Sequence, residues 1–493
     1  MDSVEKRKQA LVIVACMGVM FMTGVEGTIT ATAMPRVASA LGGYALFGWT
    51  FAAYLLAQAV IIPIYGRLAD LYGRKPMFFI GAGLFTLGSL LCGLAPNMLF
   101  LVFARVVQGL GAGGIMPVAQ TIVGDVLTPA QRARLQGFFA SMWALAAVIG
   151  PMLGALIVDK FTWPMIFWFN IPIAIIVTLL IAFLFRETPR RAEHKIDLFG
   201  AVLLVIAIGT FMLALMQADH LGSLLLPVLG ISLISAVLFA RQERRAPEPL
   251  LPFFLWKDHI IRTCNLGALA VGAASMGVSV FVPTYMQAVL GTSAYAAGTP
   301  LMFMSLGWPV AATLSGRLML RASYRTSAIL GAIVLMVGSG MLAMMGPETS
   351  TTFASVASFL TGIGLGFLNS PFFVACQDAA SWNVRGIAIA FNAFNRMMGA
   401  ALGTAFLGAA MNTSLARSLP AIADPVQYLV DPVRRALFSA AELTHVTGAV
   451  ADALRLAFIV GIVIAAAGGI AGWALPKGLR PTNAHRDRPD VAA

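Results

Sequence analysis

Residues 66–76 read Gly-Arg-Leu-Ala-Asp-Leu-Tyr-Gly-Arg-Lys-Pro, a short polar stretch in a very apolar chain. It carries three positive charges, one negative charge and two glycines, and long apolar runs flank it at residues 47–65 and 77–94. Apolar runs of this length are typical of membrane-spanning helices. The sequence therefore predicts a tight, charged hairpin between two membrane helices, and the rest of the chain is interpreted outward from it.

The composition places the chain among polytopic α-helical membrane proteins. Hydrophobic residues make up 59% of the 493 residues and charged residues only 11%, whereas a soluble domain carries about 25% charged residues. A membrane β-barrel would show short alternating segments instead of repeated apolar runs of about 20 residues. The formal net charge of +12 comes from basic residues in short connecting segments, so we expect no nucleic-acid partner.

Residue types that would build other kinds of site are scattered along the sequence. The four cysteines stand singly in or at the end of apolar runs, and the five histidines fall in connecting segments or tails. A sequence without a CxxC or Cys/His cluster predicts neither a disulfide framework nor a metal site. A GxxxxGK[ST] nucleotide-binding motif is missing as well, so we expect no use of ATP by this chain alone and no cofactor.

The apolar runs predict fourteen membrane-spanning helices. They lie at about 10–33, 47–65, 77–95, 99–123, 135–158, 164–185, 198–217, 221–240, 264–287, 298–316, 326–345, 352–376, 386–411 and 452–475. The predicted parts are a cytoplasmic N-terminus (1–9), an N-terminal six-helix half (10–186), two inserted helices with cytoplasmic connectors (187–262), a C-terminal six-helix half (263–475) and a cytoplasmic tail (476–493).

The distribution of lysine and arginine predicts the orientation. If the N-terminus lies inside, the inner segments hold most of the 33 basic residues, and the outer loops hold only Arg36, Lys160, Arg417, Arg434 and Arg435. The positive-inside rule then puts both termini in the cytoplasm. We expect a multi-pass protein of the inner (plasma) membrane that contacts lipids and acts as a monomer, with its longest outer loop at 412–451.

An internal repeat relates the two six-helix halves. Gly66-Arg67-Leu68 recurs as Gly316-Arg317-Leu318, 250 residues later, and other glycines recur in order at nearly the same offset. An ordered series at a nearly constant offset is typical of a duplicated unit. Two parallel six-helix halves that flank an inserted pair give a 6+2+6 arrangement. A site between such halves, near the middle of the bilayer, is typical of transporters.

Six segments of the sequence carry motifs: residues 66–76, 105–113, 150–154, 25–28, 167–172, and 283–287 with 291–293. In this order they resemble motif A, motif B, motif C of the antiporters, and the signatures of the first, sixth and ninth helix of the major facilitator superfamily, in particular of its branch of fourteen-span drug:proton antiporters. The resemblance covers about residues 10–475 and implies the major facilitator fold, proton-coupled export of drugs and the proton gradient as the energy source.

Glu26 lies inside the first apolar run, where a carboxylate is costly unless it is neutralised or placed in a cavity. Its counterpart in the repeat is Met276, so the repeat itself requires no acid there. We predict that Glu26 carries the coupling proton or engages a cationic substrate. The alternative is a carboxylate at the outer helix end that faces water. The resemblance implies that Arg105, in the fourth span, tunes the proton site, with a structural salt bridge as the alternative.

The charged hairpin is predicted to act as a gate. Asp70 can cap a helix N-terminus and pair with a basic side chain across the two halves, which would hold one conformation closed on the cytoplasmic side. The second copy has Leu320 at the corresponding position, so the predicted latch exists in one half only. The alternative is a basic loop that only sets the topology. The predicted gating residues are Gly66, Arg67, Asp70, Gly73, Arg74 and Lys75.

Two further sets of residues are candidates for function. Gly150, Pro151 and Gly154 permit a close helix approach and a kink, and the resemblance ties them to antiport. Aromatic and amide side chains in the spans are candidates for a substrate cavity, because aromatic rings stack on cations. The candidates are Tyr54, Gln58, Trp143, Tyr285, Gln287, Asn395 and Arg396.

Three classes of function compete for this sequence. A polytopic enzyme needs clustered titratable groups, which the spans lack, so we expect no enzyme. A transporter of one defined metabolite, as importer or facilitator, is the closer alternative. Motif C and Glu26 favour a proton-coupled secondary transporter that exports small amphipathic or cationic compounds by alternating access, with a small-molecule substrate and the proton as its partners.

Overall fold

The protein is all-helical in its computed structural model, which describes residues 3–42, 46–187, 197–216, 221–246, 249–250, 254–420, 422, 425–430 and 435–481. Within these ranges every regular element is a helix. Helices suit the apolar runs of the sequence, because they satisfy their own backbone hydrogen bonds inside a bilayer. The connector at 188–196 and the predicted tail from residue 482 onward lie outside the described residues.

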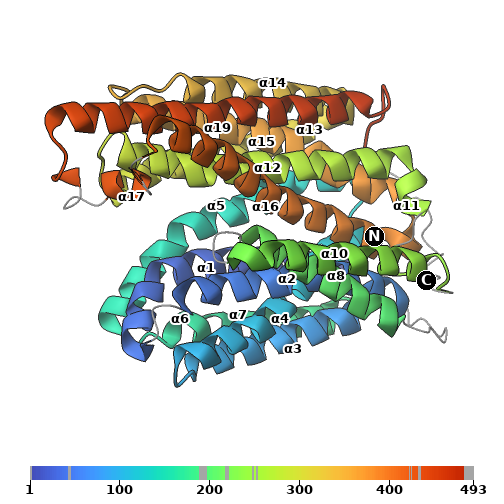
Figure 1. Cartoon of the computed structure of the whole chain (residues 1–493). Coiled ribbons are helices and arrows are strands. Elements are labelled where there is room, and N and C mark those ends of the chain that lie inside the picture. The colour runs from blue at the N-terminus through green and yellow to red at the C-terminus, as the bar shows by residue number, and fades with distance from the viewer. Residues whose placement is uncertain are drawn as a thin grey trace.

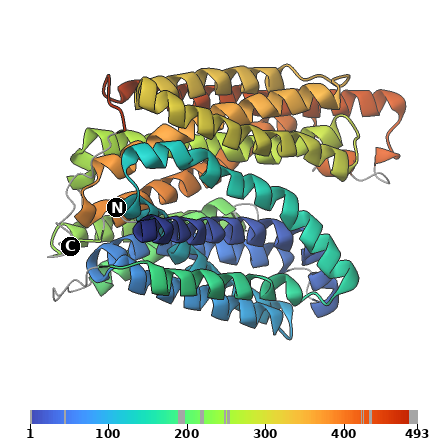
Figure 2. The same cartoon turned by 180° about the vertical axis from the view of Figure 1, so that it is seen from behind.

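The N-terminal half forms one layer of the molecule, drawn in blue to teal (Figures 1 and 2). Its apolar side chains form two buried clusters of their own, and the predicted sixth span is divided into two helices. Its elements are α1 (Ser3–Leu41), α2 (Phe47–Tyr72), α3 (Arg74–Gly93), α4 (Met98–Val126), α5 (Pro129–Lys160), α6 (Met165–Trp168) and α7 (Asn170–Leu184).

The C-terminal half forms the second layer, drawn in yellow-green to red (Figure 1). Its side chains gather in one large buried cluster, so each half has its own apolar core. Its elements are α12 (His259–Ala288), α13 (Ala294–Arg321), α14 (Tyr324–Ala343), α15 (Thr351–Ala379), the 3-10 turn η3 (Trp382–Val384), α16 (Arg385–Ser418), α17 (Pro425–Val430) and α19 (Ala440–Ala474).

The inserted segment packs on one flank of the boundary between the halves. A shared apolar cluster joins Val60 of α2 with Leu204 of α8 and Phe239 of α10, and Phe394 of α16 packs against it. The segment thereby touches both halves at once. Its elements are α8 (Leu198–Met216), η2 (Gly222–Leu224), α10 (Leu225–Glu243) and the short α11 (Phe254–Lys257).

Twelve helices of the described chain are long and apolar enough to cross a membrane, whereas the sequence predicted fourteen spans. The two predicted spans outside this set are helical, as α13 and α16. Both carry polar residues within their length, such as Thr313 and Ser315 in α13 and Asn392, Asn395 and Arg396 in α16. Polar side chains lower the hydropathy of helices that face an interior surface.

Several helix boundaries differ from the sequence prediction. α1 continues to Leu41 instead of ending near residue 33, and α19 begins at Ala440, inside the predicted outer loop 412–451. The predicted hairpin is helical up to Tyr72 and again from Arg74, which leaves only Gly73 as the turn. Hydropathy marks the apolar part of a helix, about 20 residues across a bilayer, and these helices are longer than that.

The two copies of the repeated glycine lie where helices of opposite halves cross. Gly66 of α2 packs against Ala390 of α16, and a Cβ at residue 66 would also lie 2.9 Å from the Gly386 carbonyl oxygen. Gly316 of α13 packs against the backbone of Ala133 of α5. Small residues allow helix backbones to approach this closely. The repeat thus supplies one close crossing on each flank of the boundary.

Replacing Gly66 with valine should prevent the halves from closing at this crossing, because the new side chain would overlap Ala390. Spin labels on the exposed residues 76 and 381 are expected to show a longer-distance population by electron–electron double resonance. Gly83 has open space around it, so Gly83→Ala is the matched control and should leave the distance distribution unchanged. An unchanged distribution in folded Gly66→Val would contradict this account of the crossing.

Candidate functional site

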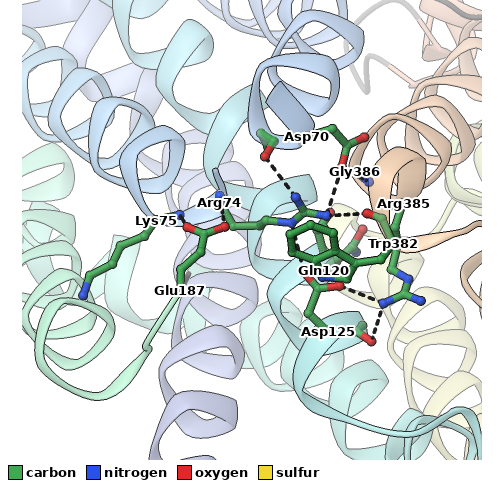
Figure 3. A network of polar contacts seen from close by, with 12 residues as sticks. Asp70, Arg74, Lys75, Gln120, Asp125, Glu187, Trp382, Arg385 and Gly386 are labelled. Atoms are coloured by element: carbon green, nitrogen blue, oxygen red, sulfur yellow. Dashed lines mark hydrogen bonds and ion pairs between the residues drawn. The ribbon is translucent and has the colours of Figure 1, made fainter. Parts of the chain in front are cut away.

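The Asp70 carboxylate is fully buried where α2 of one half meets the first turn of α16 of the other (Figure 3). The backbone N–H of Gly386 donates to its Oδ1 at 2.9 Å, and the N–H of Ile387 donates to its Oδ2 at 2.8 Å. N–H groups in the first turn of a helix have no partner inside that helix. Asp70 therefore caps a helix of the opposite half and adds negative charge at the positive end of its dipole.

Two arginines and a second carboxylate extend this contact. Arg74 of α3 pairs with Asp70 at 3.0 Å and with Asp125 of α4 at 2.9 Å. Arg385 of α16 pairs with Asp125 at 2.8 Å, and Arg74 donates to the Trp382 carbonyl at 2.8 Å and stacks over its indole ring. The basic partner of Asp70 thus comes from its own half, while Asp125 and Arg385 join the two halves. We call these five residues the latch cluster.

The turn between α2 and α3 positions the latch cluster. Gly73 has a φ of +102°, a conformation that favours glycine. The Glu187 carboxylate accepts the backbone N–H of Arg74 at 2.7 Å and that of Lys75 at 2.8 Å, and so caps α3. The Lys75 ammonium donates to two carbonyls at the end of α7, so its hydrogen bonds stay within the N-terminal half. The Nε of Arg67 is buried and has no partner among the described residues.

A second polar contact joins the halves beside the latch cluster. Arg132 of α5 donates to the Gln377 side-chain oxygen of α15 at 2.7 Å, and the Gln377 amide donates to the Gln120 carbonyl of α4 at 3.5 Å. Hydrogen bonds to a charged group contribute about 1.5–3 kcal/mol each. These contacts lie at the end where α2 and α4 terminate and α3, α5 and α16 begin. That end of the boundary is closed by buried polar groups.

Sequence reasoning missed Asp125, Glu187, Trp382 and Arg385 as parts of this contact. The sequence places Asp125 at the end of the fourth span and suggests only that it faces the cytoplasm. The available signal was an acid at the end of one span and an arginine at the start of another, in opposite halves and on the same predicted side.

Glu26 lies on α1 and has no exposed surface. Its carboxylate pairs with Arg105 of α4 and accepts hydrogen bonds from the Asn170 side-chain amide of α7 and from the Thr30 hydroxyl, the latter at 3.2 Å. These donors offset the cost of burying the charge. The structure thus places Glu26 in a closed polar group, and the alternative of a water-facing carboxylate at the outer helix end is wrong.

Arg105 is held from several sides. Its Nε donates to the Thr50 carbonyl of α2 at 3.1 Å, and one Nη donates to the Gln108 side-chain oxygen at 2.6 Å. Its guanidinium carbon lies 4.2 Å from the centre of the Tyr54 ring, so this predicted cavity residue belongs to the buried group instead. We call the group the buried carboxylate cluster; its members are Glu26, Thr30, Thr50, Tyr54, Arg105, Gln108 and Asn170.

The motif C residues pack on α1 next to this cluster. A Cβ at Gly150 would collide with the Thr28 hydroxyl, which donates to the Ala146 carbonyl at 3.1 Å. Pro151 lies inside α5, and Gly154 is buried one turn farther along the same helix. The close helix approach expected for motif C is therefore present, and its partner is the helix that carries Glu26.

A cavity of about 450 Å³ lies between the halves. Residues of α1, α4 and α5 line it on one side, and residues of α12, α13, α15 and α16 on the other. Trp143 and Arg396 are the two predicted cavity residues in this lining. Gly27 and Thr28 line it as well, although Glu26, which precedes them, does not.

Four further predicted cavity residues also lie away from this lining. Gln58 packs its backbone against a glycine of α4, and Tyr285 is buried in the C-terminal half with its ring 6.4 Å from that of Phe458. The Gln287 carbonyl accepts a hydrogen bond from Arg435, and the Asn395 amide donates to a carbonyl one turn earlier. The sequence identified polar and aromatic residues in the spans but not the helix face that each occupies.

The structure shows no group of three or more His, Cys, Asp or Glu side chains that could hold a metal ion, within the residues that it describes. The four cysteines are free and buried.

A profile described as Major Facilitator Superfamily matches residues 16–404, well over half of the chain. The chain belongs to the Major Facilitator Superfamily. It is a multi-pass membrane transporter and not an enzyme, which agrees with the two-layer helical fold and the cavity between its halves.

Two curated relatives of this transporter come from Bacillus subtilis (strain 168). It is 34% identical over 397 residues to Multidrug resistance protein 3, with 79% of this chain and 77% of that protein covered. It is 32% identical over 412 residues to Multidrug transporter protein MdtP, with 83% and 76% covered. Both relatives are named for multidrug resistance or transport.

Two solved structures show the same fold as this transporter. The human organic anion transporter MFSD10 (TETRAN) aligns with a TM-score of 0.61 at 13% identity and covers 94% of this chain and 100% of its own. The proton:xylose symporter XylE, bound to 6-bromo-6-deoxy-D-glucose, aligns with a TM-score of 0.62 at 12% identity, with 93% and 95% covered. At these identities the likeness concerns the fold alone.

Replacing Asp70 with asparagine should lower transport by about tenfold or more and leave substrate affinity nearly unchanged, because the latch cluster lies outside the cavity lining. Transport into proteoliposomes and equilibrium binding to the purified variant measure the two effects. Asp452→Asn is the matched control, because its exposed ion pair with Arg455 contributes little. Loss of binding in folded Asp70→Asn would count against a latch that is separate from the cavity.

Replacing Arg105 with methionine should destabilise the protein by about 3–5 kcal/mol, because the Glu26 carboxylate would be left buried without its charged partner. Adding Glu26→Gln to the same protein should restore most of the lost stability. Thermal unfolding of the two single variants and the double variant gives the interaction free energy between residues 26 and 105. Additive effects of the two substitutions would show that the pair does not act as a unit.

Proposed function

We propose that this transporter is a proton-coupled exporter of small amphipathic compounds, of the multidrug type, that works by alternating access. The observation that carries the proposal is the cavity lined by both halves, whose boundary is closed at one end by the buried latch cluster. Halves that rock about a central cavity expose it first to one side and then to the other. The names of the two Bacillus subtilis relatives support multidrug transport.

We assign the coupling proton to Glu26 and a tuning role to Arg105. A proton on Glu26 would remove the negative charge that holds Arg105 and Asn170, and so would loosen α1 from α4 and α7. Gly27 and Thr28 line the cavity, so a shift of α1 would change the shape of the cavity directly. Proton binding from outside and substrate release would then compete, and the proton gradient would supply the energy without a cofactor.

The topology that we propose is fourteen membrane helices in a 6+2+6 arrangement, as in the drug:proton antiporter branch. α13 and α16 then span the membrane together with the twelve more apolar helices. The positive-inside rule puts both termini, and with them the latch cluster, on the cytoplasmic side of the plasma membrane. The latch cluster would therefore close the cytoplasmic end, and we expect the transporter to act as a monomer.

The residues that line the cavity support amphipathic substrates more than cationic ones. Phe139, Trp143, Trp308 and Phe373 give the cavity aromatic surface. The described lining residues include no carboxylate that would pair with a cation, since Glu26 is turned toward Arg105. We therefore propose amphipathic compounds as the substrate class.

Glu26→Gln should abolish transport driven by a pH gradient and leave downhill exchange of substrate largely intact, because the neutral amide cannot take up a proton. Proteoliposomes with an imposed pH gradient and a panel of labelled amphipathic compounds measure this. The matched control is Glu348→Gln, since Glu348 is exposed in an outer loop. Unchanged gradient-driven transport in Glu26→Gln would overturn the assignment. Transport of one metabolite down its own gradient, and of no other compound, would instead support a specific facilitator.

A further inference from the structure

Arg396 of α16 is the charged residue in the described lining of the cavity. Its side chain is partly buried, and no ion pair or hydrogen bond joins it to any residue that the structure describes. The arginines of the latch cluster and the buried carboxylate cluster are each bound by carboxylates. Among the described residues Arg396 therefore differs from them in facing the cavity without a carboxylate partner.

Close packing behind Arg396 fixes where its side chain begins. A Cβ at Gly272 of α12 would collide with the Arg396 carbonyl, so the two helices touch at this point. Asn392, one turn earlier on α16, donates to the Cys264 carbonyl of α12 at 3.2 Å and holds the same pair of helices together. The guanidinium group thus starts from a rigid backbone and extends toward the cavity.

An arginine at membrane depth is costly and normally pairs with another charge or faces a water-filled cavity. The acid closest in sequence to the lining is Glu26, and its carboxylate is already bound by Arg105, Asn170 and Thr30. The lining has no aspartate, glutamate, lysine or histidine among its described members. The negative charge that would complement Arg396 must therefore come from what enters the cavity.

The rest of the lining defines what such a ligand would carry besides its charge. Aromatic rings from both halves offer broad apolar surface, and the Gln120 side-chain oxygen and the Gln136 side-chain nitrogen are buried without partners among the described residues. These amides add a hydrogen-bond acceptor and a donor to the N-terminal side of the cavity. A ligand that fits has an aromatic or aliphatic body and polar groups.

We propose that the cavity binds amphipathic anions, and that Arg396 pairs with a carboxylate, sulfonate or phosphate on their polar end. This inference rests on the proposed function, in that it takes the cavity as the transport site. Guanidinium matches such groups with two parallel hydrogen bonds, and the pairing is stronger in a site that excludes water. An amphipathic cation would gain aromatic stacking but would meet the like charge of Arg396.

Three pyrene compounds of the same body test the charge preference: pyrenebutyrate, pyrenebutanol and pyrenebutylamine. Binding to the purified transporter in nanodiscs is followed by energy transfer from tryptophan to pyrene, because Trp143 and Trp308 line the cavity. Empty nanodiscs of the same lipid give the partition background, and Trp143→Phe should reduce the signal if the pyrene lies in the cavity. The expected order of affinity is butyrate, then butanol, then butylamine.

Arg396→Gln should weaken pyrenebutyrate binding by about tenfold or more and change pyrenebutanol binding by less than about twofold. Arg396→Lys should keep part of the preference, because it keeps the charge without the two-pronged geometry. Arg417→Gln is the matched control, since Arg417 is exposed at the far end of the same helix. Equal weakening of all three ligands, or wild-type preference for the amine, would overturn the proposal.

The ranking of the three ligands on the wild-type protein decides the question even if Arg396→Gln does not fold. Binding is measured at equilibrium without a pH gradient, so it does not depend on proton coupling. A transporter that binds pyrenebutyrate best through Arg396 but shows no gradient-driven export would uphold the anion site and refute the proposed coupling. Gradient-driven export without any preference for anions would uphold the proposed coupling and refute the anion site.

Discussion

A carboxylate buried between two halves of a protein makes each half depend on the other. Asp70 has no exposed surface, and two of its hydrogen bonds come from backbone N–H groups of α16 that its own half cannot supply. If the halves separate here, the carboxylate and the first turn of α16 must both be hydrated. Opening this end leaves Asp70 paired with Arg74 of its own half and exchanges the two backbone N–H donors of α16 for water.

Polar closure suits a protein that has to open repeatedly. Three of the large apolar clusters lie mostly within one half, and a fourth joins α2, the inserted helices and α16, so opening at the latch cluster leaves the core of each half in place. Hydrogen bonds to charged groups, such as those of the latch cluster, contribute only about 1.5–3 kcal/mol each. Two conformations that differ by such exchanges remain close enough in free energy for a bound proton or ligand to shift their populations.

The sequence predicted the helices and the repeat, and it singled out Glu26 and Asp70, both of which are buried in polar contacts, because apolar length and a misplaced charge are local signals. It did not predict that Asp125 and Arg385 join the two halves. Asp125 and Arg385 are 260 positions apart, and only the packing of α4 against α16 brings them together. Tyr54 and Gln58 were assigned to the cavity because of their residue type, but a helix that is buried on most sides gives no periodic signal for the face that each residue occupies.

The inserted pair of helices makes the two flanks of the boundary unequal. α8 and α10 cover the side where α2 meets α16, in front in Figure 1, whereas α5 lies against α13 on the opposite side, in front in Figure 2. A compound dissolved in the bilayer thus meets a wall of two extra helices on one side. On the other side α5 and α13 pack directly against each other at Gly137 and Thr313, away from the inserted helices. In the plane of the membrane the transporter has a front and a back, which its internal repeat alone would not give it.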